Sequence, residues 1–319
     1  MANAISVRQV LSRDEIHELT RRSNWAGAWA IVSTWAVIAG AFAALSIWPN
    51  PLTFLLAAIV IGGRQLALAI LMHEAAHRTL FAKNSLNDVV ADWLCAKPMG
   101  ADVARYKRHH LSHHAHTGTD ADPDLSLALD RPMTRRSLLR KVARDLLGLT
   151  GIKRVFGQFL IYCEVLEYTV SAAAKRRPRN GRRFFDYARA FVRNAMGFAI
   201  TNLLLMGALA AANQLWLYSV WVVAYLTTFS LFLRIRSLAE HACTERSADE
   251  LKNTRTTRAG VFARMTVAPF CVNFHLEHHL LVAVPYFRLP ELHRLLRERG
   301  LLEHVPGYAD VLRTVSAGY

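Results

Sequence analysis

The chain has 319 residues, 53% of them hydrophobic, and a formal net charge of +15 at pH 7. Its four cysteines form no C-x-x-C pair, which excludes a disulfide framework and an iron–sulfur site. No nucleic-acid-binding module accompanies basic runs such as Lys175–Arg179. We therefore assign the positive charge to a surface that faces anionic lipid head groups, and exclude nucleic acid as a partner.

The first 24 residues are polar and lack the apolar stretch of a cleavable signal peptide. Within them, Ser12-Arg-Asp-Glu15 matches a capping box, in which the serine and the glutamate cap the first turn of a helix. A short helix is therefore expected before the first membrane span.

Three long segments carry almost no charge. Residues 25–48 and 194–233 hold none, and residues 51–72 hold only Arg64. A spanning helix needs about 20 apolar residues, so these segments predict four transmembrane helices, the last two joined near Asn213-Gln214. Helices buried in a soluble domain rarely contain uncharged runs of this length. The expected fold class is an all-α integral membrane protein, with four transmembrane helices in two hairpins and a cytoplasmic helical cap.

Lysine and arginine are distributed unevenly along the chain. The short connections around Pro49-Asn50 and Asn213 hold neither, so the positive-inside rule places both termini in the cytoplasm. The Arg- and Ala-rich composition favours a bacterial inner membrane. We expect one membrane domain in five parts: an N-terminal helix at 1–24, two spans at 25–72, a cytoplasmic segment at 73–193, two spans at 194–233 and a cytoplasmic segment at 234–319.

Histidines gather in three clusters. Box one is His73-Glu-Ala-Ala-His77, box two lies in the run Arg108–His116, and box three is His275-Leu-Glu-His278-His279. Boxes two and three both contain H-x-x-H-H. Because residues i, i+3 and i+4 share one face of a helix, each such motif is expected to direct three imidazoles at one point. Two complete hairpins return the chain to the same side, so the boxes can meet at the cytoplasmic face.

The boxes provide more imidazoles than one metal ion can bind. A catalytic zinc takes three protein ligands, whereas eight histidines suit two metals with four ligands each. Imidazole binds Zn, Cu, Fe or Ni, so the ligand type alone does not select the metal. The predicted metal ligands are His73, His77, His110, His113, His114, His275, His278 and His279.

At these residues the chain resembles the integral-membrane fatty acid desaturases. The similarity is most specific at Asn273–Leu280 and Val284–His293, is supported by HEAAH, HHLSHHAHT and Arg236–His241, and covers roughly residues 25–295. The resemblance implies two Fe ions in a di-iron centre, a narrow tunnel for an acyl chain, and dependence on O2 and an external electron donor. It also implies a ninth ligand, His241. Ser237 stands where similar proteins have an asparagine that contacts the centre through water.

Two departures from the family pattern refine this expectation. Three residues separate His73 from His77, where acyl-CoA desaturases have four, which favours an acyl chain already held in a membrane lipid. The heme-binding sequence H-P-G-G is absent, so no cytochrome b5 domain is fused to the chain. The expected electron donor is a separate ferredoxin, cytochrome b5 or similar reductase system.

Several polar residues near the boxes are expected to contact the metal ligands. An aspartate of the turn at 120–124, which lacks the glycine and the final acid of a calcium loop, is expected to orient a ligand imidazole. Arg64, inside a span, is a functional candidate or has an internal partner. The candidates for contact with a ligand are Ser237, Glu74, Glu240, Glu277, His109 and Asp122.

The leading interpretation is an O2-dependent acyl-lipid desaturase. The same boxes would also serve a lipid or carotenoid hydroxylase or ketolase. An intramembrane zinc protease would use His73, Glu74 and His77, but the D-G motif that supplies its third ligand is absent and two H-x-x-H-H motifs would be unexplained. A metal transporter would place its ligands inside the spans, whereas these lie at their ends.

Overall fold

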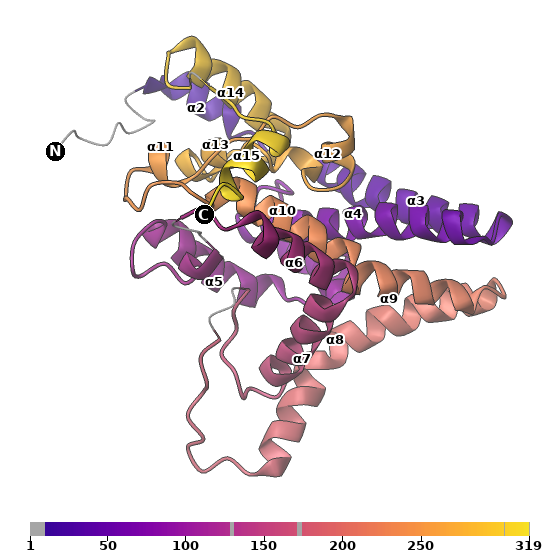
Figure 1. Cartoon of the computed structure of the whole chain (residues 1–319). Coiled ribbons are helices and arrows are strands. Elements are labelled where there is room, and N and C mark those ends of the chain that lie inside the picture. Colours follow the sequence, from indigo (N-terminus) through magenta and orange to yellow (C-terminus); the bar gives the residue numbers. More distant parts are fainter. Residues whose placement is uncertain (1–9, 128–130, 171–173, 303, 319) are drawn as a thin grey trace.

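The computed structural model of the chain describes residues 10–127, 131–170, 174–302 and 304–318. Its regular elements over these ranges are all helical, as expected. Figure 1 shows a bundle of long helices that meets a group of shorter helices at one end. The α-helices are α2 (Arg13–Leu19), α3 (Asn24–Ile47), α4 (Pro51–Ala76), α5 (Val103–His116), α6 (Arg135–Leu146), α7 (Leu149–Tyr162), α8 (Phe184–Ala211), α9 (Tyr218–Leu226), α10 (Thr228–His241), α11 (Glu250–Asn253), α12 (Val261–Met265), α13 (His275–Leu280), α14 (Leu289–Glu298) and α15 (Tyr308–Val315).

The expected capping box opens α2. The Ser12 hydroxyl accepts from the Glu15 amide at 3.2 Å, and the Ser12 amide donates to the Glu15 carboxylate at 2.7 Å. These two bonds satisfy amides that a helix start leaves free. A second capping serine, Ser23, accepts from the amide of Ala26 and starts α3.

Four helical segments are long and apolar enough to cross a membrane, in agreement with the sequence analysis. They are Arg13–Ile47, Pro51–Ala76, Phe184–Ala211 and Leu215–His241. Residues 86–96, too short to cross, fold instead as the π-helical turns Leu86–Val90 and Asp92–Ala96. The third segment begins at Phe184, before the uncharged run that starts at residue 194.

The fourth apolar segment is not one continuous helix, although its sequence contains no proline or glycine. α9 ends at Leu226 and α10 begins at Thr228, with Thr227 at φ −110° and ψ −84°. Arg154 of α7 donates to the carbonyl of Tyr225 at 2.6 Å and to the Ser230 hydroxyl at 3.1 Å, on either side of the break. A long-range side chain therefore binds the backbone group that the break leaves free.

α4 lies at the centre of the bundle and contacts α3, α5, α9 and α10. Its crossing with α10 is tight, because a Cβ on Gly62 would lie 2.9 Å from the backbone nitrogen of Phe229 and closer still to the Thr228 hydroxyl. Arg64 has an internal partner, since its guanidinium donates to the carbonyl of Met265 at 2.7 Å.

The two short connections between long helices lie at one end of the molecule. Figure 1 shows the α3–α4 and α8–α9 connections on the right, and α2, α5, α11, α13 and α14 at the opposite end. α4 and α10 both run toward that second end, where His73 and His241 lie near their last residues. The fold therefore carries histidines from distant parts of the sequence to one region.

Candidate metal centre

The nine histidines singled out in the sequence converge in two adjacent groups. The first group contains five, and its ligand atoms all lie within 4.8 Å of one another. The second group lies beside it, with the rings of His114 and His279 4.2 Å apart between centroids. The first group is His73, His77, His110, His114 and His278; the second is His113, His241, His275 and His279, with Glu240 beside it.

Each H-x-x-H-H motif was expected to direct three imidazoles at one point, but the structure divides each motif between the two groups. In box two, His110 and His114 join the first group and His113 joins the second. Box three is divided in the opposite sense, since His278 joins the first group while its neighbours join the second. The reason is that helical residues lie about 100° apart around the axis, so i and i+4 are about 40° apart, whereas i+3 and i+4 diverge by about 100°.

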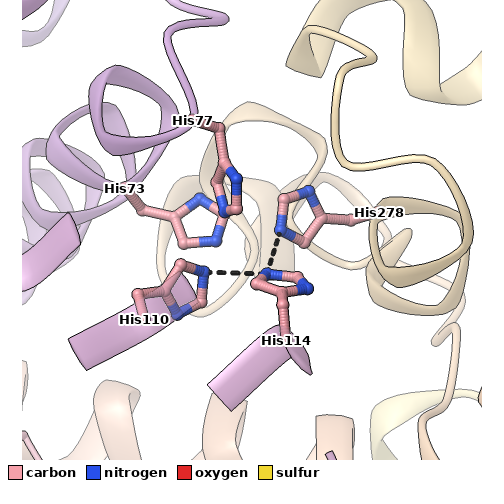
Figure 2. A group of neighbouring side chains, drawn as sticks. All are labelled: His73, His77, His110, His114 and His278. Atoms are coloured by element: carbon pink, nitrogen blue, oxygen red, sulfur yellow. Dashed lines mark hydrogen bonds between the residues drawn. The ribbon is translucent and has the colours of Figure 1, made fainter. Parts of the chain in front are cut away.

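The first group draws on three separate elements. His73 and His77 come from the end of α4, His110 and His114 from α5, and His278 from α13. Figure 2 shows the five rings pointing toward one another. Nε2 of His114 lies 3.0 Å from Nε2 of His110 and 3.1 Å from Nε2 of His278.

The second group joins the end of α10 to α5 and α13. Nε2 of His275 lies 2.8 Å from Nε2 of His241 and 3.1 Å from Nε2 of His279. His113 reaches the same place from α5, with its ring centroid 5.1 Å from that of His241. Because of the break at Thr227, the segment that positions His241 is the short helix α10, not the whole fourth span.

Burial lowers the pKa of four of these imidazoles, which favours their neutral form. Desolvation lowers the pKa of His114 to about 2, with the neighbouring His77 adding to the shift. It also holds the pKa of His110, His278 and His279 well below the usual 6.5. Neutral imidazole is the form that binds a metal ion, because protonation would occupy its lone pair.

The nitrogen positions fit bound metal ions better than a hydrogen-bond network. An imidazole nitrogen has one in-plane site, so Nε2 of His114 can form one hydrogen bond and not two. Both nitrogens of His73 are buried and have no hydrogen-bond partner within the described part of the chain. Two imidazole nitrogens on one ion, at about 2.0–2.1 Å each, lie about 2.9–3.4 Å apart. Three of the four close pairs here, at 3.0, 3.1 and 3.1 Å, match that spacing.

Three of the expected contact residues lie against the histidine groups. Oδ1 of Asp122 is 2.8 Å from Nδ1 of His113, a contact that turns Nε2 of this ring toward the second group. Glu74 and Glu240 each lie 3.6 Å from Nδ1 of a histidine, His73 and His275 respectively, which is too long for a hydrogen bond.

Glu277, one of the candidates for contact with a metal ligand, bonds two other side chains. It is fully buried, accepts from the Thr256 hydroxyl, and lies 2.5 Å from Nδ1 of His293. This contact ties box three to α14 instead. His293 lies outside the three histidine boxes, and its sequence signal is its place at the end of the Val284–His293 stretch that resembles the family.

The remaining candidates lie at the edge of the site. Nε2 of His109 contacts Asp124 at 2.8 Å, an aspartate partner that the sequence did not specify. Exposed His116 bonds the carbonyl of Ser112 in its own helix. Ser237 lies one turn before His241 and is partly exposed, and its hydroxyl forms no hydrogen bond with any described residue.

Comparison with known proteins agrees with this geometry. The sequence pattern of the family described as "Fatty acid desaturase" matches residues 46–311, which include all nine histidines. The chain is also similar to the dihydrorhizobitoxine desaturase of Bradyrhizobium elkanii, with 28% identity over 308 residues that cover 91% of this chain and 79% of the relative. This chain, with its two histidine groups beside membrane-length helices, belongs to the fatty acid desaturase family.

Proposed function

We propose that the protein is an O2-dependent di-iron desaturase that introduces a C=C double bond into an acyl chain of a membrane lipid. The observation that carries the proposal is the pair of adjacent histidine groups, five imidazoles in one and four in the other, at the ends of α4 and α10. One ion cannot use nine imidazoles, so each group is assigned one iron.

Two bound irons would activate O2, the oxidant that removes hydrogen from unactivated methylene groups. The chain's own residues supply position and environment. Neutral imidazoles would hold the metals without a complete ligand sphere, and Asp122 orients His113 because its Oδ1 accepts a hydrogen bond from Nδ1–H of the ring. Burial of the groups excludes bulk water, and small errors in the placement of a methylene pair are costly to the rate.

The membrane arrangement is part of the proposal. The four long helices form two hairpins, and the histidine groups lie at the cytoplasmic face of a bacterial inner membrane with both termini on that side. The positive-inside rule supports this arrangement, as do the short connections that lie together at the other end of the molecule. A lipid acyl chain is then within reach, and the electrons come from a separate ferredoxin, cytochrome b5 or similar reductase system.

The zinc protease alternative requires Glu74 as a free general base. Glu74 is instead buried, accepts from the Thr79 hydroxyl at 2.8 Å, and accepts from the amide of Tyr286 at 3.0 Å. Its histidines, His73 and His77, also share their group with three others. These contacts favour a structural role for the glutamate.

Two measurements test the proposed function. Elemental analysis of purified protein is expected to find about two irons per chain, and one zinc with no iron would contradict the proposal. Mass spectrometry of lipids from an expressing strain is expected to show acyl chains lighter by two hydrogen atoms than those of a strain that expresses His110→Ala. A gain of one oxygen atom would identify a hydroxylase instead. Because the Bradyrhizobium elkanii relative is named for dihydrorhizobitoxine, products other than lipids are analysed as well.

A further inference from the structure

A small polar cavity lies beside the second histidine group. Its volume is about 10 Å³, counted as space for the centre of a water molecule, which is enough for one water. It reaches from the metal-binding side chains to residues of the segment that follows α10, where Glu245 is 68% exposed. The main polar lining residues are His113, Asp122, Asp124, His241, Glu245 and Asn253.

Asn253 lines this cavity and has one buried polar atom without a partner among the described residues. The residue is 3% exposed, and its amide nitrogen donates to the carbonyls of Thr117 and Ser247 at 3.1 and 3.0 Å. Its Oδ1 is buried and has no hydrogen-bond partner among the described residues. A buried amide oxygen is costly to leave unpaired, and a water molecule in the cavity would satisfy it.

The segment that carries Asn253 is packed tightly against the end of box two. Gly118 has φ +75°, and a Cβ there would lie 3.0 Å from Cβ of Asn253. The Thr244 hydroxyl donates to the carbonyl of His241 at 2.9 Å and to that of Asn253 at 3.1 Å. The cavity is therefore bounded by packed groups, and its lining includes both His241 of the second histidine group and the exposed Glu245.

The proposed reaction needs such a connection. In balanced form, R–CH2–CH2–R′ + O2 + 2H⁺ + 2e⁻ gives R–CH=CH–R′ + 2H2O. Two C–H bonds and the O–O bond break, the C=C bond and four O–H bonds form, and the one-electron donor protein supplies two of the four electrons that O2 accepts. Two protons must therefore enter a buried centre and two waters must leave it at each turnover.

We propose that the cavity beside Asn253 is the solvent passage of the metal centre. A water held by Oδ1 of Asn253 connects the second histidine group with the exposed side chain of Glu245. Protons and product water move through the cavity by way of this water. This inference rests on the proposed function. It assigns to Asn253 the role of a positioning residue that holds water and does not touch the metals or the substrate.

Two substitutions of Asn253 distinguish a solvent passage from a purely structural role of this residue. Asn253→Leu has the shape of asparagine but puts a methyl group where Oδ1 stands, so the cavity loses the acceptor that would hold the water. Asn253→Ala leaves the cavity larger and open. Both remove the same two amide hydrogen bonds, so a difference between them reports on the cavity alone.

The probe is azide, a small anion that binds oxidised iron and produces a visible absorption band. Asn253→Leu is expected to retain iron but to bind azide slower by about tenfold or more than Asn253→Ala, because entry then requires a conformational change. Its turnover is also expected to show a larger D2O isotope effect than that of Asn253→Ala. Equal azide rates and equal isotope effects in the two variants would overturn the inference.

A second pair of variants decides the matter if neither Asn253 variant folds. Leu125 lines the cavity, and its side chain forms no hydrogen bond, so Leu125→Phe narrows the passage and Leu125→Ala widens it. The same order of azide rates is expected, and identical rates would contradict the passage. If the wild-type protein contains no iron, no azide band forms in any variant, and that result overturns the proposed function together with the inference.

Discussion

The carboxylate of Asp122 and the imidazole of His113 lie 2.8 Å apart, Oδ1 to Nδ1, and both side chains are buried. The contact joins the turn that follows α5 to the one histidine of box two that faces the second group. Asp122 also accepts from the amide of Asp124 at 2.8 Å, so its carboxylate is itself held in place.

Removal of this carboxylate is expected to weaken metal binding at the second group. Asp122→Ala should lower metal affinity by about 10–100-fold, because His113 loses the acceptor that orients its ring. Asp122→Asn retains an acceptor oxygen and should have a smaller effect. The control is Asp120→Ala, since Asp120 is 93% exposed and pairs with Arg246. Metal titration followed by iron absorbance measures the difference, and equal affinities in Asp122→Ala and Asp120→Ala would contradict the assignment.

His241 is expected to be a metal ligand supplied by α10. His241→Ala should lower the iron content from about two to about one per chain and abolish activity, because the second group would lose one of its four imidazoles. Ser237→Ala, one turn earlier, should keep both irons and only slow turnover. The control is His116→Ala, because His116 is exposed and its Nδ1 bonds the carbonyl of Ser112 in its own helix. Elemental analysis measures the content, and full iron with full activity in His241→Ala would show that eight histidines suffice.

The crossing of α4 and α10 is expected to tolerate no added methyl group. Gly62→Ala would push α10 away from α4, because the new Cβ would lie 2.9 Å from the nitrogen of Phe229. We expect a loss of about 1–3 kcal/mol in unfolding free energy and weaker iron binding at the second group. Gly40→Ala is the matched control, because no atom outside its own helix lies within 4 Å of that Cβ. It should be neutral or stabilise by up to about 1 kcal/mol, and equal stabilities would refute this account of the crossing.

Acid is expected to destabilise the metal-free protein. Burial holds the pKa of His110, His275, His278 and His279 well below 6.5, so below about pH 6.5 the unfolded chain binds more protons than the folded one. The unfolding free energy therefore decreases as the pH is lowered, by up to about 1.4 kcal/mol per pH unit for each histidine. Thermal unfolding between about pH 7 and about pH 5 measures the slope. His110→Gln should have a shallower slope, and a flat profile in the unsubstituted protein would contradict the prediction.

Local sequence rules identified most of the elements and eight of the nine histidines that converge. Uncharged runs predicted the four membrane-length helices, Ser12 and Glu15 predicted the start of α2, and the three boxes contain eight of those histidines. The ninth, His241, was expected only from the resemblance to the family. The local signals depend on residues a few positions apart, because helix periodicity, capping and span length are short-range properties.

The tertiary structure determined how the nine histidines are divided between the two groups. The division of box two between groups, the contact of Glu277 with His293, and the break at Thr227 all depend on partners distant in sequence. In each case a side chain reaches its partner because helices pack at particular crossings, as Gly62 permits between α4 and α10. Such packing depends on many side chains at once, so H-x-x-H-H specifies which imidazoles lie near one another, and only the folded chain determines which of them join the same histidine group.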